Sequence, residues 1–325
     1  MKAEILALLR ESGDFISGQE LCSRFGVTRA AVWKAIGQLK KEGYEIEAVQ
    51  NRGYKLAAAE VYGENELRSR IHTLWAGSEL HFHRITGSTN LLAKQAGEEG
   101  APHGSLFVAD EQTAGRGRRG RSWQSPPGAN IYFTILLRPE LAPDQASMLT
   151  LVMAHSVADA IGRYTGLEPE IKWPNDVLLD DKKICGILTE MSLEREFIHY
   201  VVCGVGINVA DQDFPEGVRE HATAVESVWG RRVSKGELLQ YVMEAFERDY
   251  DAFVAAGDLT PLLESYNGRL VNLGRRVRVL DPKGEWEGTA LGINARGELL
   301  VEDESGAVTA VFAGEVSVRG IYGYV

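Results

Sequence analysis

The sequence predicts an α+β protein in three segments, and a different pattern of residues marks each one. Residues 1–60 combine amphipathic helices with a short hairpin, which is typical of a winged helix-turn-helix. Residues 65–270 mix helices with apolar strands, which favours a central α/β domain on a mixed or antiparallel sheet. Residues 271–325 contain short strands with Gly-rich turns, which indicates a small β-barrel.

Helix and turn signals define the N-terminal segment. The sequence SGQE at residues 17–20 has the form of a capping box, so a short helix is expected to begin there. Thr28 is placed to cap the next helix, in which Trp33 and Leu39 are among the apolar positions. The sequence NRG at residues 51–53 is a hairpin turn signal, and the hairpin around it would be the wing.

Basic residues on this helix and at the wing favour contact with DNA over contact with protein. Recognition helices carry side chains to the phosphate backbone and the bases, and a wing tip can reach the backbone or the minor groove. A small helical protein-interaction domain is the alternative interpretation of the same segment. The residues expected to contact DNA are Thr28, Arg29, Lys34, Lys40, Lys41 and Arg52.

Composition and charge limit the classes of protein that fit this chain. The net charge of −11 argues against non-specific affinity for nucleic acid over the whole surface. Residues 1–58 carry nine Lys and Arg against seven Asp and Glu, a net charge of +2, so the remainder of the chain is at −13. No run of about 18 apolar residues exists, so no membrane span is expected. Three widely spaced cysteines and the lack of a signal-peptide pattern predict a cytoplasmic protein with reduced thiols.

The most informative stretch is Gly115–Arg121, which places four arginines and three glycines in seven residues. Each guanidinium offers a planar fork of donors for carboxylate or phosphate, and glycines let the backbone approach a ligand. The stretch also fits G-x-G-x-x-G, but Pro126 and Pro127 exclude the helix that a dinucleotide fold requires. We therefore predict a loop that clamps an anion; a solvated basic loop that binds nucleic acid non-specifically is the alternative.

Four further clusters place polar groups at turns or strand ends. Hydroxyls and amides in these clusters suit a neutral polar ligand, cations suit a carboxylate and a phosphate, and glycines allow close approach. Each cluster alone also fits an ordinary turn, helix cap or core strand, so only their combination predicts a binding site. The clusters are TGSTN at residues 86–90, KWPND at 172–176, KKICGILTE at 182–190 and GVGINV at 204–209.

The five clusters together resemble, in order along the chain, those of the bacterial biotin protein ligases (biotin–[acetyl-CoA-carboxylase] ligases). The winged segment resembles the bifunctional type that is also the biotin operon repressor, and the resemblance implies an SH3-like fold for the C-terminal barrel. It implies that the chain forms biotinyl-5′-AMP from biotin and ATP with Mg²⁺ and transfers biotin to a lysine of a biotin carboxyl carrier protein domain. It further implies a biotin-responsive repressor that binds operator DNA and forms a homodimer when the adenylate is bound. A ligand-sensing repressor without ligase activity and a relative of the lipoate or octanoyl transferases are the alternatives.

The resemblance also implies a role for individual residues. Lys183, Arg118 and Asp176 would be catalytic, with Lys183 at the biotin carboxylate and the α-phosphate, and Asp176 as a metal ligand or as the base for the acceptor lysine. Residues 211–225 lie where the family has an adenylate-binding loop. The residues implied at biotin are Ser88, Thr89, Asn90, Gln112, Arg116, Gly117, Arg118, Lys183 and Gly186. The residues implied at the nucleotide are Arg118, Arg121, Trp123, Lys172, Asn175, Lys183 and Asn208.

Overall fold

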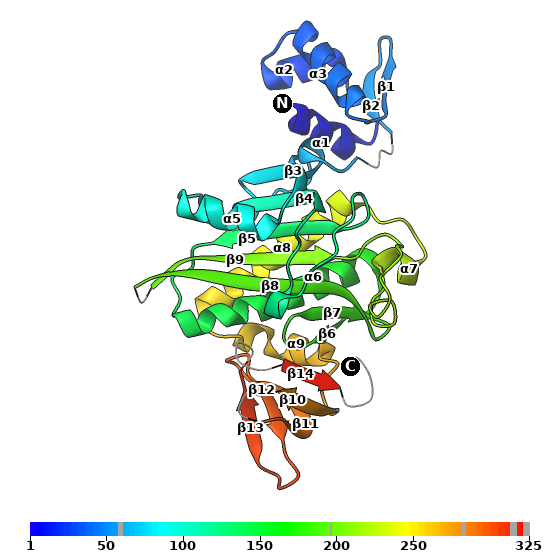
Figure 1. Ribbon diagram of the computed structural model, residues 1–325. Coiled ribbons are helices and arrows are strands. Elements are labelled where there is room, and N and C mark those ends of the chain that lie inside the picture. Colours follow the sequence, from blue (N-terminus) through cyan, green and yellow to red (C-terminus); the bar gives the residue numbers. More distant parts are fainter. Residues whose placement is uncertain (58–60, 196, 281–283, 313–316, 321–325) are drawn as a thin grey trace. The chain divides into compact units, whose positions relative to one another are not determined.

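The computed structural model describes the chain except for residues 58–60, 196, 281–283, 313–316 and 321–325 (Figure 1). The chain divides into two compact units, Met1–His72 and Thr73–Val325. No described helix combines the length and the apolar character that crossing a bilayer requires.

The N-terminal unit is the winged helix-turn-helix that the sequence predicts. Ser17 accepts a hydrogen bond from the backbone N–H of Glu20 at the start of the second helix, and Thr28 caps the third helix in the same way. Two antiparallel strands meet at a turn in which Asn51 has a φ of 65°, and they form the wing. The elements are α1 (Lys2–Ser12), α2 (Gly18–Phe25), α3 (Arg29–Lys41), β1 (Ile46–Val49), β2 (Gly53–Leu56) and α4 (Glu64–Arg68).

Helix α4 belongs to this unit, although the sequence analysis assigns residues from 65 onward to the central segment. The Glu66 carboxylate is only 3% exposed and accepts hydrogen bonds from Arg10 of α1 at 2.8 and 3.0 Å. Arg70 donates to the same carboxylate. A buried acid needs such partners, so the segment that carries Glu66 is held against α1.

Trp33 is exposed, although the sequence pattern counts it among the apolar positions of its helix. The buried side of α3 consists of Val32, Ala35, Ile36 and Leu39. The side chain of Trp33 is 72% exposed, because its place in the 3.6-residue helical repeat lies outside that buried stripe.

A seven-stranded mixed sheet forms the centre of the second unit. Its strand order is β3-β4-β5-β9-β8-β7-β6; β3 pairs with β4 in parallel, and every other pair is antiparallel. This confirms the mixed sheet that the sequence predicts. The strands are β3 (Leu80–Thr86), β4 (Leu106–Gln112), β5 (Ile131–Leu137), β6 (Glu170–Lys172), β7 (Asp176–Leu179), β8 (Lys182–Glu194) and β9 (Phe197–Ile207).

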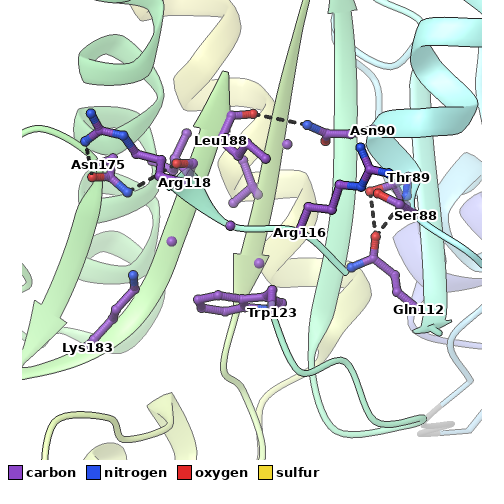
Figure 2. A pocket seen from close by; sticks show the side chains of 16 residues that line it. Ser88, Thr89, Asn90, Gln112, Arg116, Arg118, Trp123, Asn175, Lys183 and Leu188 are labelled. Carbon is purple, nitrogen blue, oxygen red and sulfur yellow. Dashed lines mark hydrogen bonds between the residues drawn. The ribbon is translucent and has the colours of Figure 1, made fainter. Parts of the chain in front are cut away.

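Helices cover the two faces of this sheet differently. Helices α6 (Met148–Thr165) and α8 (Lys235–Ala256) pack together along one face (Figure 1). Helix α5 (Thr89–Glu98) packs over β4, β5 and β9 on the other face, and Figure 2 shows its Asn90 beside Leu188 of β8. The remaining helices are η1 (Arg118–Gly120), η2 (Pro143–Ser147), α7 (Val225–Trp229), η3 (Thr260–Leu262) and α9 (Leu263–Arg269).

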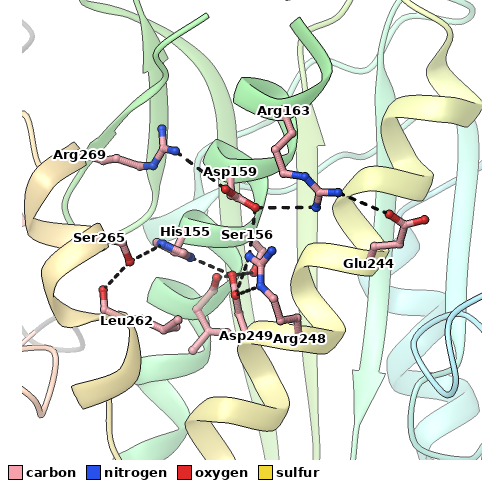
Figure 3. Close-up of polar contacts among 11 residues, drawn as sticks. His155, Ser156, Asp159, Arg163, Glu244, Arg248, Asp249, Leu262, Ser265 and Arg269 are labelled. Carbon is pink, nitrogen blue, oxygen red and sulfur yellow. Dashed lines mark hydrogen bonds and ion pairs between the residues drawn. The ribbon is translucent and has the colours of Figure 1, made fainter. Parts of the chain in front are cut away.

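A buried polar network joins α6, α8 and α9 (Figure 3). The Asp249 carboxylate on α8 lies 2.8 Å from His155 Nδ1 and accepts a hydrogen bond from Ser156 at 2.8 Å. On the other side of the imidazole, His155 Nε2 lies 2.8 Å from Ser265 Oγ of α9. Burial raises the pKa of Asp249, but hydrogen bonds and charge from His155 and Arg248 outweigh it, so the net pKa lies below its ordinary value.

The C-terminal part of this unit is a five-stranded antiparallel sheet in the order β13-β12-β11-β10-β14, as the predicted small barrel requires. The buried indole of Trp173 donates to the carbonyl oxygen of Gly297 at 3.0 Å, which fastens this sheet to the central one. The strands are β10 (Arg276–Leu280), β11 (Trp286–Ile293), β12 (Leu299–Glu302), β13 (Val308–Val311) and β14 (Ser317–Gly320).

Asp249→Asn should lower the free energy of unfolding at pH 7 by about 3 kcal/mol, because it leaves buried donors facing a neutral amide. Asp249 has a lowered pKa in the fold, so its stabilisation is present above its unfolded pKa of about 3.9 and is lost as the pH falls. Urea unfolding curves of wild type and variant should therefore converge below about pH 4. Glu264→Gln, at an exposed acid on α9, is the control, and an unchanged urea midpoint for Asp249→Asn would contradict the prediction.

Candidate functional site

Three glycines form the floor of a cavity on the face of the sheet that α5 covers. Gly204 and Gly206 are two residues apart on β9, and Gly206 pairs with Gly186 of β8, so all three face the same side. A Cβ atom at Gly204 would lie 1.9 Å from Asn90 Oδ1, and one at Gly206 would lie 2.4 Å from Trp123 Nε1. The missing side chains therefore make room for an amide and an indole against the strand backbone.

The start of α5 forms a polar wall above this floor. Ser88 is the N-cap residue, and its side chain makes no capping hydrogen bond. Gln112, at the end of β4, takes over that role: its Oε1 accepts from the backbone N–H of Thr89 at 2.9 Å. The Gln112 amide nitrogen donates to Ser125 Oγ at 3.0 Å, which fixes the side chain in one orientation. The hydroxyl of Ser88 is left for other partners.

Asn90 is held on every side. Its Nδ2 donates to the carbonyl oxygen of Leu188 at 3.3 Å and to the Glu190 carboxylate at 2.9 Å. Its Oδ1 accepts from Thr134 Oγ1 at 2.7 Å. Burial raises the pKa of Glu190, but hydrogen bonds from Asn90 and Lys94 outweigh it and lower the pKa overall. The carboxylate therefore stays charged and anchors Asn90.

The segment Gly115–Trp123, called the Gly/Arg loop below, folds back on itself and places Trp123 and Arg118 in the site. The backbone N–H of Gly117 donates to Arg121 O at 2.7 Å, and that of Trp123 donates to Gly115 O at 2.9 Å. Arg118 Nη1 donates to Asn175 Oδ1 at 2.9 Å, while Arg116 extends toward the start of α5 (Figure 2). Burial lowers the pKa of Arg118, and the nearby Asp176 carboxylate opposes that shift.

Lys183 is the second cation of the site. Its Nζ lies 2.6 Å from Asp176 Oδ1 and 5.3 Å from the centroid of the Trp123 ring. Asn175 Nδ2 donates to the same Asp176 oxygen at 3.0 Å. The ammonium group is thus fixed between a carboxylate and an aromatic face, in the part of the site where Arg118 also lies.

Residues 211–225 are pinned to the site through their last part. The backbone N–H of Lys183 donates to His221 O at 2.8 Å, and that of Thr223 donates to Lys183 O at 3.0 Å. Asn208 Nδ2 donates to Thr223 O at 3.2 Å. The earlier part of the segment, including Phe214 and Val218, lines a cavity. The sequence analysis assigns no individual contacts in this segment.

Two adjoining cavities result. A narrow one of about 50 Å³ lies over the glycines, and a wide one of about 640 Å³ lies beside residues 214–222. Among the described residues, no group of three or more His, Cys, Asp or Glu could hold a metal ion. The residues that line both cavities are Gly117, Arg118, Trp123, Asn175 and Lys183.

Comparisons with known proteins agree across the chain. Three family models match: an HTH domain over residues 2–55, the Biotin/lipoate A/B protein ligase family over 82–208, and the Biotin protein ligase C terminal domain over 273–319. The bifunctional ligase/repressor BirA of Bacillus subtilis is 35% identical over 98% of this chain and 98% of its own length. The chain belongs to the biotin protein ligase family.

Further relatives of this biotin protein ligase support the same assignment. The bifunctional ligase/repressor BirA of Escherichia coli is 30% identical over 97% of this chain and 96% of its own length. Among solved structures, the biotin protein ligase of Aquifex aeolicus in complex with biotin and ATP matches with a TM-score of 0.66 and 30% identity. The match covers 75% of this chain and 99% of that chain.

The structure brings the predicted site residues of the biotin protein ligase together. All nine residues implied at biotin line the narrow cavity, and all seven implied at the nucleotide line the wide one. Sequence reasoning missed Thr134 and Glu190, which hold Asn90. Thr134 could have been recognised from the sequence, because it interrupts the otherwise apolar or aromatic strand β5.

The residues expected at DNA lie in the N-terminal unit of the ligase, and most are on its surface. The side chain of Thr28 is used as a helix cap, and Arg29 donates to Gln19 Oε1 at 3.0 Å. Arg52 of the wing lies over the ring of Phe15, 4.2 Å from its centroid. The exposed lysines Lys34, Lys40 and Lys41 complete the set on α3.

Gly204→Ala should lower the free energy of unfolding by about 2 kcal/mol, because the new methyl group displaces Asn90 from its buried hydrogen bonds. Guanidinium unfolding measures the change, and Gly268→Ala, where a Cβ meets open space, is the control. In an Asn90→Ala background, Gly204→Ala should lower the free energy of unfolding by less than it does in the wild type, because the side chain that the methyl group displaces is no longer there. A Gly204→Ala protein as stable as wild type would refute the packing argument.

Proposed function

We propose that this chain forms biotinyl-5′-AMP from biotin and ATP and transfers biotin to a lysine of a biotin carboxyl carrier protein domain. We propose that it also represses transcription in response to biotin. One observation carries the ligase assignment: two cavities with different linings meet at a wall that holds Arg118, Trp123 and Lys183. Adenylation needs this arrangement, because it must bring a carboxylate to a phosphorus atom.

The narrow cavity suits the biotin ring system. The ureido group is neutral and polar, and the hydroxyls of Ser88 and Thr89 with the amides of Asn90 and Gln112 lie at that wall. Asn90 and Gln112 are already fixed by protein partners, so they offer oriented groups at little further entropic cost. The glycine floor seats Asn90 and Trp123 against the strands, and the ring system would bind beside these two side chains.

Arg118 and Lys183 stabilise the first half-reaction. A biotin carboxylate oxygen attacks the α-phosphorus, the bond to the bridging oxygen breaks, and pyrophosphate leaves. Both reactants are anions, and charge builds on the phosphoryl oxygens during the attack, so fixed cations at the junction lower the barrier. Trp123 excludes water from the side of the glycine floor. Arg116 and Arg121, nearer the surface, belong to the same loop.

Asp176 acts by holding Lys183. One of its oxygens accepts from both Lys183 and Asn175, which favours this role over that of a metal ligand. Because the described residues offer no cluster for a metal, Mg²⁺ would arrive with ATP and take most of its ligands from phosphate oxygens and water. Lys172 and Asn208 line the wide cavity and would contact the nucleotide.

In the second half-reaction, the acceptor amine attacks the acyl carbonyl, loses a proton, and AMP leaves. The mixed anhydride hydrolyses in bulk water, so the Gly/Arg loop and residues 211–225 would protect it at the cavity mouth. A ligand-sensing repressor without ligase activity would not need the paired cations at the junction. A lipoate or octanoyl transferase relative would not need the winged unit.

We assign the repressor activity to the N-terminal unit, because the positive charge of its exposed lysines on α3 is complementary to the negative phosphates of operator DNA. We also propose that the adenylate-bound protein forms homodimers. Exposed Met191, Leu193 and Phe197 on the β8–β9 hairpin offer apolar surface for a second copy to cover. Because the proposed activities use ATP, a carrier domain and operator DNA, we propose that the protein works in the cytoplasm.

Lys183→Gln should lower pyrophosphate release from biotin and ATP by at least about 100-fold, because it removes one fixed charge at the reacting phosphate. Glutamine can still donate to Asp176, so the thermal unfolding midpoint should stay near the wild-type value. Lys182→Gln, at the exposed neighbouring lysine, is the matched control and should keep its rate. Pyrophosphate release by Lys183→Gln within tenfold of wild type would contradict the assignment.

Removal of residues 1–72 should abolish DNA binding and leave biotinylation of an apo-carrier domain largely intact. The cut falls at residue 72, because Glu66 and Leu67 of α4 are buried in the N-terminal unit. Gel shift and transfer of radiolabelled biotin give the two readouts on the same preparation. DNA binding retained by the truncated protein would refute the location of the repressor activity.

A further inference from the structure

Trp33 is unusual for a residue on a solvent-facing helix surface. Its indole is 72% exposed, and no described residue stacks on it. Single exposed aliphatic side chains are common, but an indole offers a large rigid apolar surface that is costly to leave in water. Trp33 lies four residues after Arg29 and beside Lys34, so this apolar group projects from a basic surface.

Gly37 gives a second, independent observation on the same face. It lies four residues after Trp33, in the middle of α3, where glycine costs about 1 kcal/mol relative to alanine. A Cβ atom at Gly37 would meet nothing within 4 Å, so packing inside the protein does not require the glycine. Ala30, three residues before Trp33, is also small and exposed. The side chains that flank the indole along the helix, at Ala30 and Gly37, are therefore small or absent.

From these features we infer that Trp33 is a specificity-determining residue that reads thymine in the major groove. The inference rests on the proposed repressor function. Charge selects the occupant, because Lys34 and Lys41 on this face would meet phosphates. The small residues Ala30 and Gly37 let the helix backbone approach the base edges. Thymine is the base that presents a methyl group in the major groove, and an indole is suited to contact it.

The residues on this face of α3 then have two kinds of role. Lys34, Lys40 and Lys41 supply affinity that depends on salt and not on sequence. Trp33 supplies discrimination, since an apolar contact gains little from a base edge that lacks the methyl group. The two kinds of contact predict different responses to the same change in DNA, and this separates them experimentally.

The test uses the full-length protein with biotin and ATP. A duplex is first selected by the wild-type protein from a random pool, and its thymines are then replaced one at a time by uracil, which removes only the methyl group. Wild type should lose about five- to tenfold in affinity at one or two positions. Trp33→Ala should bind the thymine and uracil duplexes equally, and Trp33→Phe should keep part of the difference.

Lys34→Ala is the matched control. It should weaken binding to all duplexes and lower the salt slope by about one, while keeping the thymine–uracil difference. Unchanged carrier biotinylation and an unchanged unfolding midpoint show that Trp33→Ala is folded. Gly37→Ala should raise the unfolding midpoint of the N-terminal unit and weaken DNA binding, two shifts of opposite sign that a purely structural glycine would not produce.

The outcomes separate the two proposals. If wild type selects no duplex, the repressor function fails. If it selects one and Trp33→Ala shows the same thymine–uracil difference, the inference about Trp33 is overturned and the repressor function stands. Loss of carrier biotinylation in Trp33→Ala without a change in DNA affinity would also overturn it, by assigning the indole to a protein contact.

Discussion

The close approach of two side chains to the backbone of β8 and β9 is the constraint on which the site depends. Asn90 and Trp123 lie where Cβ atoms of Gly204 and Gly206 would otherwise be, so neither position tolerates a side chain. From this follow the glycine floor, the position of α5 above it, and the turn of the Gly/Arg loop that carries Trp123. A larger residue at either glycine would move the wall and the loop together.

Electrostatic preorganisation completes the site. Lys183 and Arg118 are not left as isolated cations; a carboxylate and an amide hold them in place before any anion arrives. The protein dipoles are therefore oriented in advance, and little reorganisation remains for the moment of reaction. The same two cations line both cavities, so the charge at the site is local and differs in sign from the net charge of this acidic chain, whose exposed acids are screened by salt.

The sequence predicted the segments and the mixed sheet, because turns, caps and strand patterns are local signals, and the resemblance to a family pointed to many of the residues that line the two cavities. It did not predict features that depend on tertiary partners. Trp33 was counted as apolar and is exposed, since an i, i+3 pattern does not mark the edge of a buried stripe. Glu66 falls in the central segment by sequence but is buried against Arg10 of the N-terminal unit. Thr134 matters because Thr89 and Asn90 both accept hydrogen bonds from its hydroxyl group.

The attachment of residues 221–225 to the backbone of Lys183 and Asn208 has an evolutionary consequence. Three backbone hydrogen bonds fix this stretch: Lys183 N to His221 O, Thr223 N to Lys183 O and Val225 N to Asn208 O. None of them involves a side chain of the stretch, so packing, and not these bonds, limits which residues can stand there; Ala224 and Val225 are fully buried. Insertions and substitutions before residue 221 can then reshape the lining of the wide cavity without shifting the backbone of Lys183.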